Sequence, residues 1–231
     1  NPFILRYISV YSSCVKSFNM PLVEKYHLKD RTTVGIWELV ETEEELMNPI
    51  DLSQLEAERL SDRNNPLKRK QFLAARHLLK ELIGEKKSIQ YKKSGKPFLE
   101  ESNRQISISH SDRFVALALT EVQRLGVDIE VCRRPSLAKV PDYFLNDEEM
   151  AEVLIMKVDL EQLSLYWSAK EALYKYMDDE KLDIRTSFRI FPFEIKEQGL
   201  IEAQSLLSGF PQKIILSYFR TSDYVLVVTG K

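Results

Sequence analysis

Residues 167–175 read WSAKEALYK and lie within a helical pattern that runs from about residue 160 to residue 177. An α-helix turns by about 100° per residue. Glu171 and Lys175 therefore share one narrow polar stripe, while apolar residues occupy most of the remaining circumference. A helix of this kind is normally buried. Burial of an unpaired charge costs free energy, so both side chains need partners, and a separation of four residues lets them support each other.

A second acidic motif, residues 126–130 (GVDIE), lies in a segment that alternates apolar and polar residues like a half-buried strand. Asp128 and Glu130 are two residues apart, so a strand projects both from one face. Two such carboxylates repel each other unless a cation or hydrogen-bond donors lie between them. With Glu171 they would supply three oxygen ligands for a hard divalent ion. For the helix alone, a partly buried ion pair in a core helix is an equally good explanation.

The combination of GVDIE and WSAKEALYK resembles the paired signature of the 4′-phosphopantetheinyl transferase superfamily, specifically its Sfp-type members. Two lesser motifs of that family follow the same order, residues 95–99 (GKPFL) and residues 106–111 (ISISHS). The resemblance extends from about Glu56 to residue 231. The two main motifs are specific as a pair, whereas GKP or SHS alone is a weak signal.

This resemblance implies an enzyme, a 4′-phosphopantetheinyl transferase with holo-acyl-carrier-protein synthase activity. Such an enzyme moves the phosphopantetheine arm of coenzyme A onto a serine of an acyl or peptidyl carrier protein and releases adenosine 3′,5′-bisphosphate. Asp128, Glu130 and Glu171 are the implied ligands of Mg²⁺, for which Mn²⁺ is an alternative. Glu171 is the implied base for the serine hydroxyl, directly or through a water molecule, and Lys175 and His110 complete the expected catalytic set.

The same resemblance assigns residues to coenzyme A. Those expected to bind it are Lys70, Arg76, Lys96, Pro97, Ser109, His110, Lys170 and Lys175. Taken without the family, Lys96 is an ordinary exposed lysine and His110 belongs to an ordinary turn. Pro97 favours an extended backbone at the preceding residue. Lys170 has three open interpretations: a side chain that extends along apolar surface, a partner of acidic groups, or a substrate contact. We interpret His77 as structural and Trp167 as core packing.

The order of the elements predicts an α+β fold, a pseudo-twofold pair of similar α/β subdomains, which the resemblance also implies. We expect an N-terminal extension over 1–19, an N-terminal subdomain over 20–121, and a C-terminal subdomain over 122–231 that carries the metal site. The expected helices are 51–60, 66–83, 147–156 and 160–177, and the expected strands are 34–40, 89–91, 97–99, 105–109, 114–120, 125–131, 187–194, 213–219 and 224–229. The length is about twice that of the family's homotrimeric branch, so we expect a monomeric pseudodimer.

Charge and composition exclude several classes of protein. A net charge of −2 and the absence of a recognition motif argue against a nucleic-acid binder. No apolar run approaches the roughly 18 residues of a membrane span. Two cysteines give neither a disulfide framework nor a zinc site, which fits a reducing, cytoplasmic compartment. Residues 62–104 hold twelve Lys and Arg against five acids, so this segment and the apolar segment 135–145 are candidate surfaces for an acidic carrier protein.

Two other functions remain open. The chain could bind coenzyme A or a carrier protein without turnover, although the intact set of Asp128, Glu130, Glu171 and Lys175 argues against this. It could also be a metal-dependent phosphohydrolase that uses carboxylates from a strand and a helix. The phosphohydrolase would release phosphate or nucleotide without any carrier protein.

Overall fold

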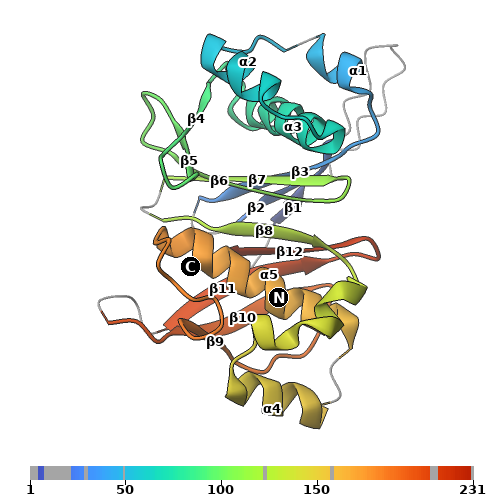
Figure 1. The fold of residues 1–231 in the computed structure, drawn as a ribbon, viewed down its shortest axis with the longest axis vertical. Helices are drawn as coiled ribbons and strands as arrows, with labels where there is room; N and C mark the ends of the chain where they lie inside the picture. Colours follow the sequence, from blue (N-terminus) through green and yellow to red (C-terminus); the bar gives the residue numbers. More distant parts are fainter. Residues whose placement is uncertain are drawn as a thin grey trace. The chain divides into compact units, whose positions relative to one another are not determined.

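The computed structural model describes residues 5–7, 22–28, 31–48, 50–121, 124–156, 159–208 and 213–229. The chain divides into two compact units, Asn1–Gln123 and Arg124–Lys231 (Figure 1). Of the expected extension, residues 5–7 form a strand, and the remainder lies outside the described residues.

The first unit contains a five-stranded antiparallel sheet with the order β1-β2-β3-β7-β6. Its strands are β1 (Leu5–Tyr7), β2 (Leu22–His27), β3 (Thr33–Glu38), β6 (Gln105–Ser111) and β7 (Phe114–Thr120). The helices α1 (Glu43–Met47), α2 (Gln54–Ser61) and α3 (Pro66–Ile83) lie together on one side of this sheet (Figure 1). A separate ribbon pairs β4 (Ile89–Tyr91) with β5 (Pro97–Leu99).

Helix α3 begins and ends where its sequence predicts. The Asn65 side chain accepts a backbone hydrogen bond in the first turn, and Pro66 follows at the position where it needs no backbone donor. Gly84 ends the helix in the left-handed conformation, with φ of 79°. Leu73 and Leu78 are fully buried in the core between α3 and the sheet. Each such burial contributes roughly 1.5–3 kcal/mol relative to exposure.

The second unit contains another five-stranded antiparallel sheet, with the order β8-β12-β11-β10-β9. Its strands are β8 (Val127–Val131), β9 (Phe188–Ile190), β10 (Gln198–Ser205), β11 (Lys213–Arg220) and β12 (Tyr224–Thr229). Helix α5 (Leu160–Met177) packs on β8 and β12. Two short 3₁₀ turns, η1 (Pro135–Lys139) and η2 (Pro141–Tyr143), lead into α4 (Asp147–Met156). The resulting mixed α+β fold agrees with expectation, and the pseudo-twofold relation of the halves stays a prediction.

Gly126 lets α5 approach the start of β8. A Cβ atom at this position would lie 1.9 Å from the backbone oxygen of Ala172 and 2.8 Å from the backbone nitrogen of Tyr176. Real Cβ atoms do not come this close to backbone, so any larger residue would force the helix and the strand apart. Ala172 follows Glu171 directly, and Tyr176 follows Lys175. Gly126 therefore sets the spacing between β8, which carries the GVDIE motif, and α5, which carries the WSAKEALYK motif.

Four of the described strands differ from the sequence-based expectation. β1, β2 and β10 have no counterpart in it, and the strand expected over 187–194 shortens to β9. β10 begins with Gln198-Gly199, which is a weak strand signal, and its pairing with β11 and β9 decides its conformation. Strand preference depends strongly on cross-strand packing, which a single sequence does not display. Among the described residues, no helix is long and apolar enough to cross a membrane.

Candidate active site

Asp128 and Glu130 lie on β8, against which α5 packs. Asp128 and Glu130 are buried, with 5% and 4% of their surface exposed. Within the described residues β8 is an edge strand that pairs with β12, and Asp128 stands opposite Val227. Buried carboxylates require partners, and each of these has a cationic one.

Two cations contact these carboxylates. Lys175 Nζ donates to Asp128 Oδ1 at 2.8 Å and to the backbone oxygen of Val127 at 3.1 Å. Arg134 Nη1 donates to Glu130 Oε2 at 2.5 Å. The helical lysine thus bonds to a strand carboxylate, whereas the four-residue spacing suggested Glu171 on its own helix as the partner.

Glu171 completes a group of three interacting carboxylates. Burial raises the pKa of the Glu171 carboxyl, and the negative charges of Asp128 and Glu130 raise it further. The nearby charge of Lys175 acts in the opposite direction. The three side chains are therefore electrostatically coupled, although Glu171 comes from α5 and the others from β8.

The chemistry of this set suits a hard divalent cation. All three potential ligands are carboxylates, and their mutual repulsion, visible in the raised pKa of Glu171, is what a bound cation would relieve. In the described part of the chain, no three His, Cys, Asp or Glu side chains are grouped closely enough to hold a metal ion as they stand. Lys175 and Arg134 neutralise two of the carboxylates here. The three carboxylates suit a divalent cation chemically, and the metal site itself stays a prediction.

A cavity of about 580 Å³ opens beside Glu171. Its lining residues are Asp142, Tyr143, Glu171, Tyr174, Lys181, Leu182, Asp183, Ile184 and Arg185. These residues come from η2, from α5 and from the segment between α5 and β9. The cavity therefore combines aromatic and aliphatic walls with charged groups, next to the proposed base.

Lys170 lies in a different environment from its neighbour Glu171. Its side chain is fully buried, and its ammonium group is 2.8 Å from Glu149 Oε2 and 2.7 Å from the backbone oxygen of Phe188, to which it donates. Glu149 Oε1 in turn accepts from the backbone N–H of Ile190 at 2.6 Å. Of the three interpretations offered for Lys170, the structure favours the partner of acidic groups. Because this lysine joins α5 to α4 and β9, we leave it out of the proposed coenzyme A site.

The Lys170→Met variant is expected to lose roughly 3–5 kcal/mol of unfolding free energy, because Glu149 remains buried without its cation. Urea denaturation followed by circular dichroism measures this loss. The double variant Lys170→Met/Glu149→Gln is expected to recover part of it, since no buried charge remains. An unchanged urea midpoint together with weaker coenzyme A binding would instead identify Lys170 as a ligand contact.

The residues expected to bind coenzyme A in the first unit differ in their surroundings. Ser109 is buried near the end of β6, and His110 beside it is exposed. Lys68 Nζ lies 3.3 Å from His110 Nδ1, a proximity that sequence reasoning missed. Lys96 and Pro97 lie at the start of β5. Lys70 Nζ donates to the backbone oxygen of Glu41 at 3.0 Å.

Arg76, which the resemblance assigned to coenzyme A, is buried. It is 5% exposed, its Nε donates to Glu56 Oε1 at 3.1 Å, and its guanidinium lies 3.2 Å from the ring centroid of Phe72. Because Glu56 and Phe72 already surround this group, we leave Arg76 out of the proposed site. His77 stacks on Trp37 and contacts the backbone oxygen of Leu46, as expected of a structural histidine.

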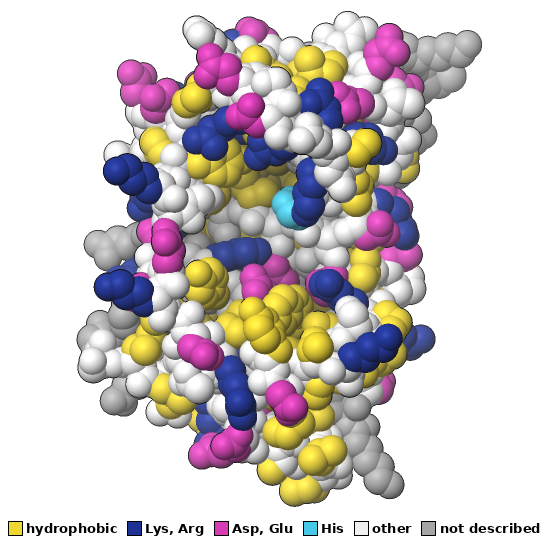
Figure 2. Space-filling model, viewed as in Figure 1, with side chains coloured by type: hydrophobic (Ala, Val, Ile, Leu, Met, Phe, Trp, Pro, Cys, Tyr) yellow, Lys and Arg dark blue, Asp and Glu magenta, His cyan; other side chains and the backbone are white. Residues whose placement is uncertain are grey.

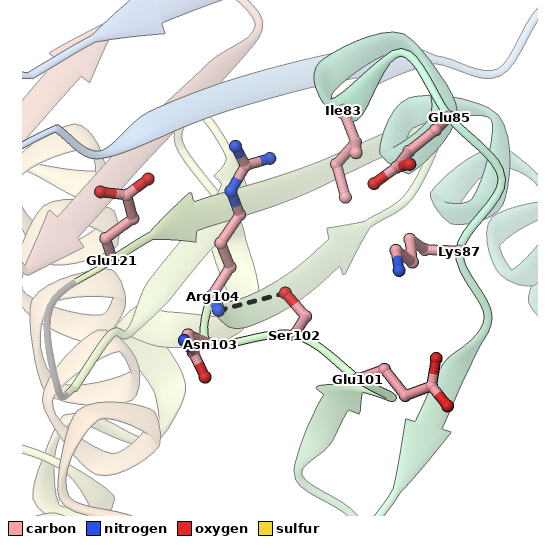
Figure 3. A pocket seen from close by; sticks show the side chains of 8 residues that line it. All are labelled: Ile83, Glu85, Lys87, Glu101, Ser102, Asn103, Arg104 and Glu121. Carbon is pink, nitrogen blue, oxygen red and sulfur yellow. Dashed lines mark hydrogen bonds between the residues drawn. The ribbon is translucent and has the colours of Figure 1, made fainter.

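A second cavity, of about 570 Å³, lies in the first unit, and its lining side chains are mostly polar (Figure 3). Arg104 precedes β6 and Glu121 follows β7, and both line it. His110 and Ser111 lie at the opposite end of the same strand pair. This cavity is thus separate from the residues expected to bind phosphate.

The segment 135–145 is partly core and partly surface. Phe144 and Leu145 are fully buried, so they belong to the core and not to a surface that a carrier protein could contact. Trp167, interpreted as core packing, is partly buried and packs edge-on against Phe144. Val140 and Tyr143 remain exposed. Hydrophobic side chains also gather on the surface over α4 (Figure 2), where Leu154, Ile155 and Met156 are exposed.

The second unit is an α+β structure in which an antiparallel sheet packs against a helix. Its edge strand holds two buried carboxylates, and the helix adds Glu171 and Lys175. This acidic site is suited to bind a cation. Residues 124–229 match the family model of the 4′-phosphopantetheinyl transferase superfamily, which supports the resemblance carried by the sequence motifs. This match supports a transferase of the phosphopantetheine group. No protein of curated function matches the sequence.

Proposed function

We propose that the protein is a 4′-phosphopantetheinyl transferase of the Sfp type. Its substrates are coenzyme A and the apo form of an acyl or peptidyl carrier protein. The observation that carries this proposal is the coupling of Asp128, Glu130 and Glu171 beside Lys175, within the unit that matches the superfamily.

The three carboxylates would hold a divalent ion, Mg²⁺ in this proposal, with Mn²⁺ as a substitute. When bound, such an ion neutralises charge on the pyrophosphate of coenzyme A and makes its phosphorus a better electrophile.

Glu171 acts as the general base. The hydroxyl of the carrier serine forms a new oxygen–phosphorus bond, and the bond from that phosphorus to the bridging oxygen of adenosine 3′,5′-bisphosphate breaks. The serine proton passes to the Glu171 carboxylate, directly or through water. Its place on α5, electrostatically coupled to the two carboxylates of β8, supports this role.

Cationic and neutral donors stabilise the phosphate oxygens. In the second unit this role falls to Lys175, whose ammonium exchanges its bond to Asp128 for one to phosphate. In the first unit we assign it to Ser109, His110 and Lys96, and we assign Lys70 to the 3′-phosphate end of coenzyme A.

Lys68 joins this set because its ammonium already lies beside His110. A lysine next to this imidazole adds a second donor for a phosphate group at the same place.

The cavity beside Glu171 would receive the pantetheine arm. The arm has apolar stretches and amide groups, and the cavity presents Tyr143, Tyr174 and Ile184 together with the charged Arg185. The carrier protein would dock by charge and apolar contact, on the basic segment 62–104 or near the exposed Val140. We further propose that the enzyme works as a monomer in the cytoplasm.

Intact-protein mass spectrometry tests the function. An apo carrier protein is incubated with the protein, coenzyme A and Mg²⁺, and the expected result is a mass gain of one phosphopantetheine. Removal of the metal with a chelator is expected to abolish the gain, and added Mg²⁺ to restore it. Loss of coenzyme A without a modified carrier would indicate a phosphohydrolase. Coenzyme A binding without any turnover, across several carriers, would indicate a silent binding protein.

A further inference from the structure

Glu130 is held from two directions. Its Oε1 accepts from the backbone N–H of Val131 at 2.9 Å, and its Oε2 accepts from Arg134 Nη1 at 2.5 Å. The Glu130 side chain is 5% exposed, whereas that of Arg134 is 44% exposed. A half-exposed cation therefore contacts a buried carboxylate near the end of the edge strand.

The neighbouring arginine does not share this contact. The guanidinium of Arg133 lies 3.4 Å from Glu161 Oε2, on the first turn of α5, and its side chain is 70% exposed. Glu161 also pairs with Arg220. Arg133 and Arg134 are adjacent in sequence and carry the same charge, but only Arg134 pairs with Glu130.

We propose that Arg134 competes with the divalent ion for Glu130 and thereby sets the metal affinity of the site. This inference rests on the proposed metal site of the transferase. A guanidinium stays charged at every physiological pH, so it remains a competitor until something displaces it. Arg134 Nε also donates to Ser136 Oγ at 2.9 Å, so displacement breaks this bond and the ion pair and moves a half-exposed side chain into water.

Direct binding of Mn²⁺ tests the competition without any turnover. Free Mn²⁺ is measured by electron paramagnetic resonance during titration of the wild-type protein and of the Arg134→Gln and Arg133→Gln variants. The Arg134→Gln variant is expected to bind Mn²⁺ about fivefold more tightly, which corresponds to about 1 kcal/mol. Arg133→Gln removes the same charge but not the contact, so its dissociation constant is expected to change by less than about twofold.

A third variant locates the effect. In a Glu130→Gln background, the Arg134→Gln change is expected to bring no gain in affinity, since the shared partner is gone. Equal affinity of the Arg134→Gln and Arg133→Gln variants, or no Mn²⁺ binding by any variant, would overturn the inference. If the wild-type protein still modifies a carrier in that case, the proposed function stands and only the role of Arg134 is wrong. If neither binding nor transfer occurs, the proposed function fails as well.

Discussion

The Glu171→Gln variant is expected to keep its fold and to lose phosphopantetheine transfer, with a fall in rate of about 10³-fold or more. The substitution preserves size and removes both a metal ligand and the proton acceptor. It does not create a buried charge without a partner. On the contrary, it removes one of three mutually repelling carboxylates, because the pKa of Glu171 is raised by burial and by Asp128 and Glu130. The thermal midpoint is therefore expected to be unchanged or slightly higher.

Mass spectrometry of the carrier protein and thermal denaturation together test this result. Glu180→Gln is a matched control, because Glu180 is an exposed glutamate of the same unit and should tolerate the change in both assays. Transfer by Glu171→Gln at the wild-type rate would show that the base and metal assignments are wrong. A large drop in its thermal midpoint would show that Glu171 has a structural role.

The Gly126→Ala variant is expected to lose roughly 3 kcal/mol or more of unfolding free energy, together with most of its activity. The new methyl group would overlap the backbone oxygen of Ala172, which lies in the middle of α5 and cannot rotate away. The helix would have to move off β8, which would carry Glu171 and Lys175 away from Asp128. Stability and site geometry are thus expected to fail together.

Urea denaturation and the transfer assay measure both effects. Gly84→Ala is the comparison, because a Cβ at Gly84 meets no atom within 4 Å and only its positive φ of 79° is strained. That strain costs roughly 1–2 kcal/mol and lies in the other unit. If Gly126→Ala were as stable as the wild-type protein, the close approach of α5 to β8 would not exist in solution.

The local signals of helices made much of the fold predictable. The first and last residues of α3 follow from Asn65, Pro66 and Gly84, which act within one turn of the chain. The reciprocal bonds between Asn146 and Glu149 likewise mark the start of α4. β2 and β10 depend instead on neighbours from distant parts of the chain, and the sequence shows no comparable local signal for them.

The site shows the same division between local and distant causes. Spacing alone placed Asp128 with Glu130 and Glu171 with Lys175. It did not reveal that Lys170 meets Glu149, because that partner comes from another helix. The contact of Lys68 with His110 was equally hidden, since the two residues are 42 positions apart. A charged residue on the buried face of a predicted helix must have a partner, but only the tertiary structure shows which residue that partner is.

The edge position of β8 has a consequence for how the protein is made. Gly126 and Thr229 bond to each other across 103 residues, and β12 is the strand on which β8 pairs. Contacts between residues so far apart form slowly, because a long loop must close first. During synthesis, Asp128 and Glu130 therefore emerge long before their strand partner does. Until β12 arrives they remain in water, where screening weakens their repulsion. We expect the acidic site to be among the last parts of this unit to assemble.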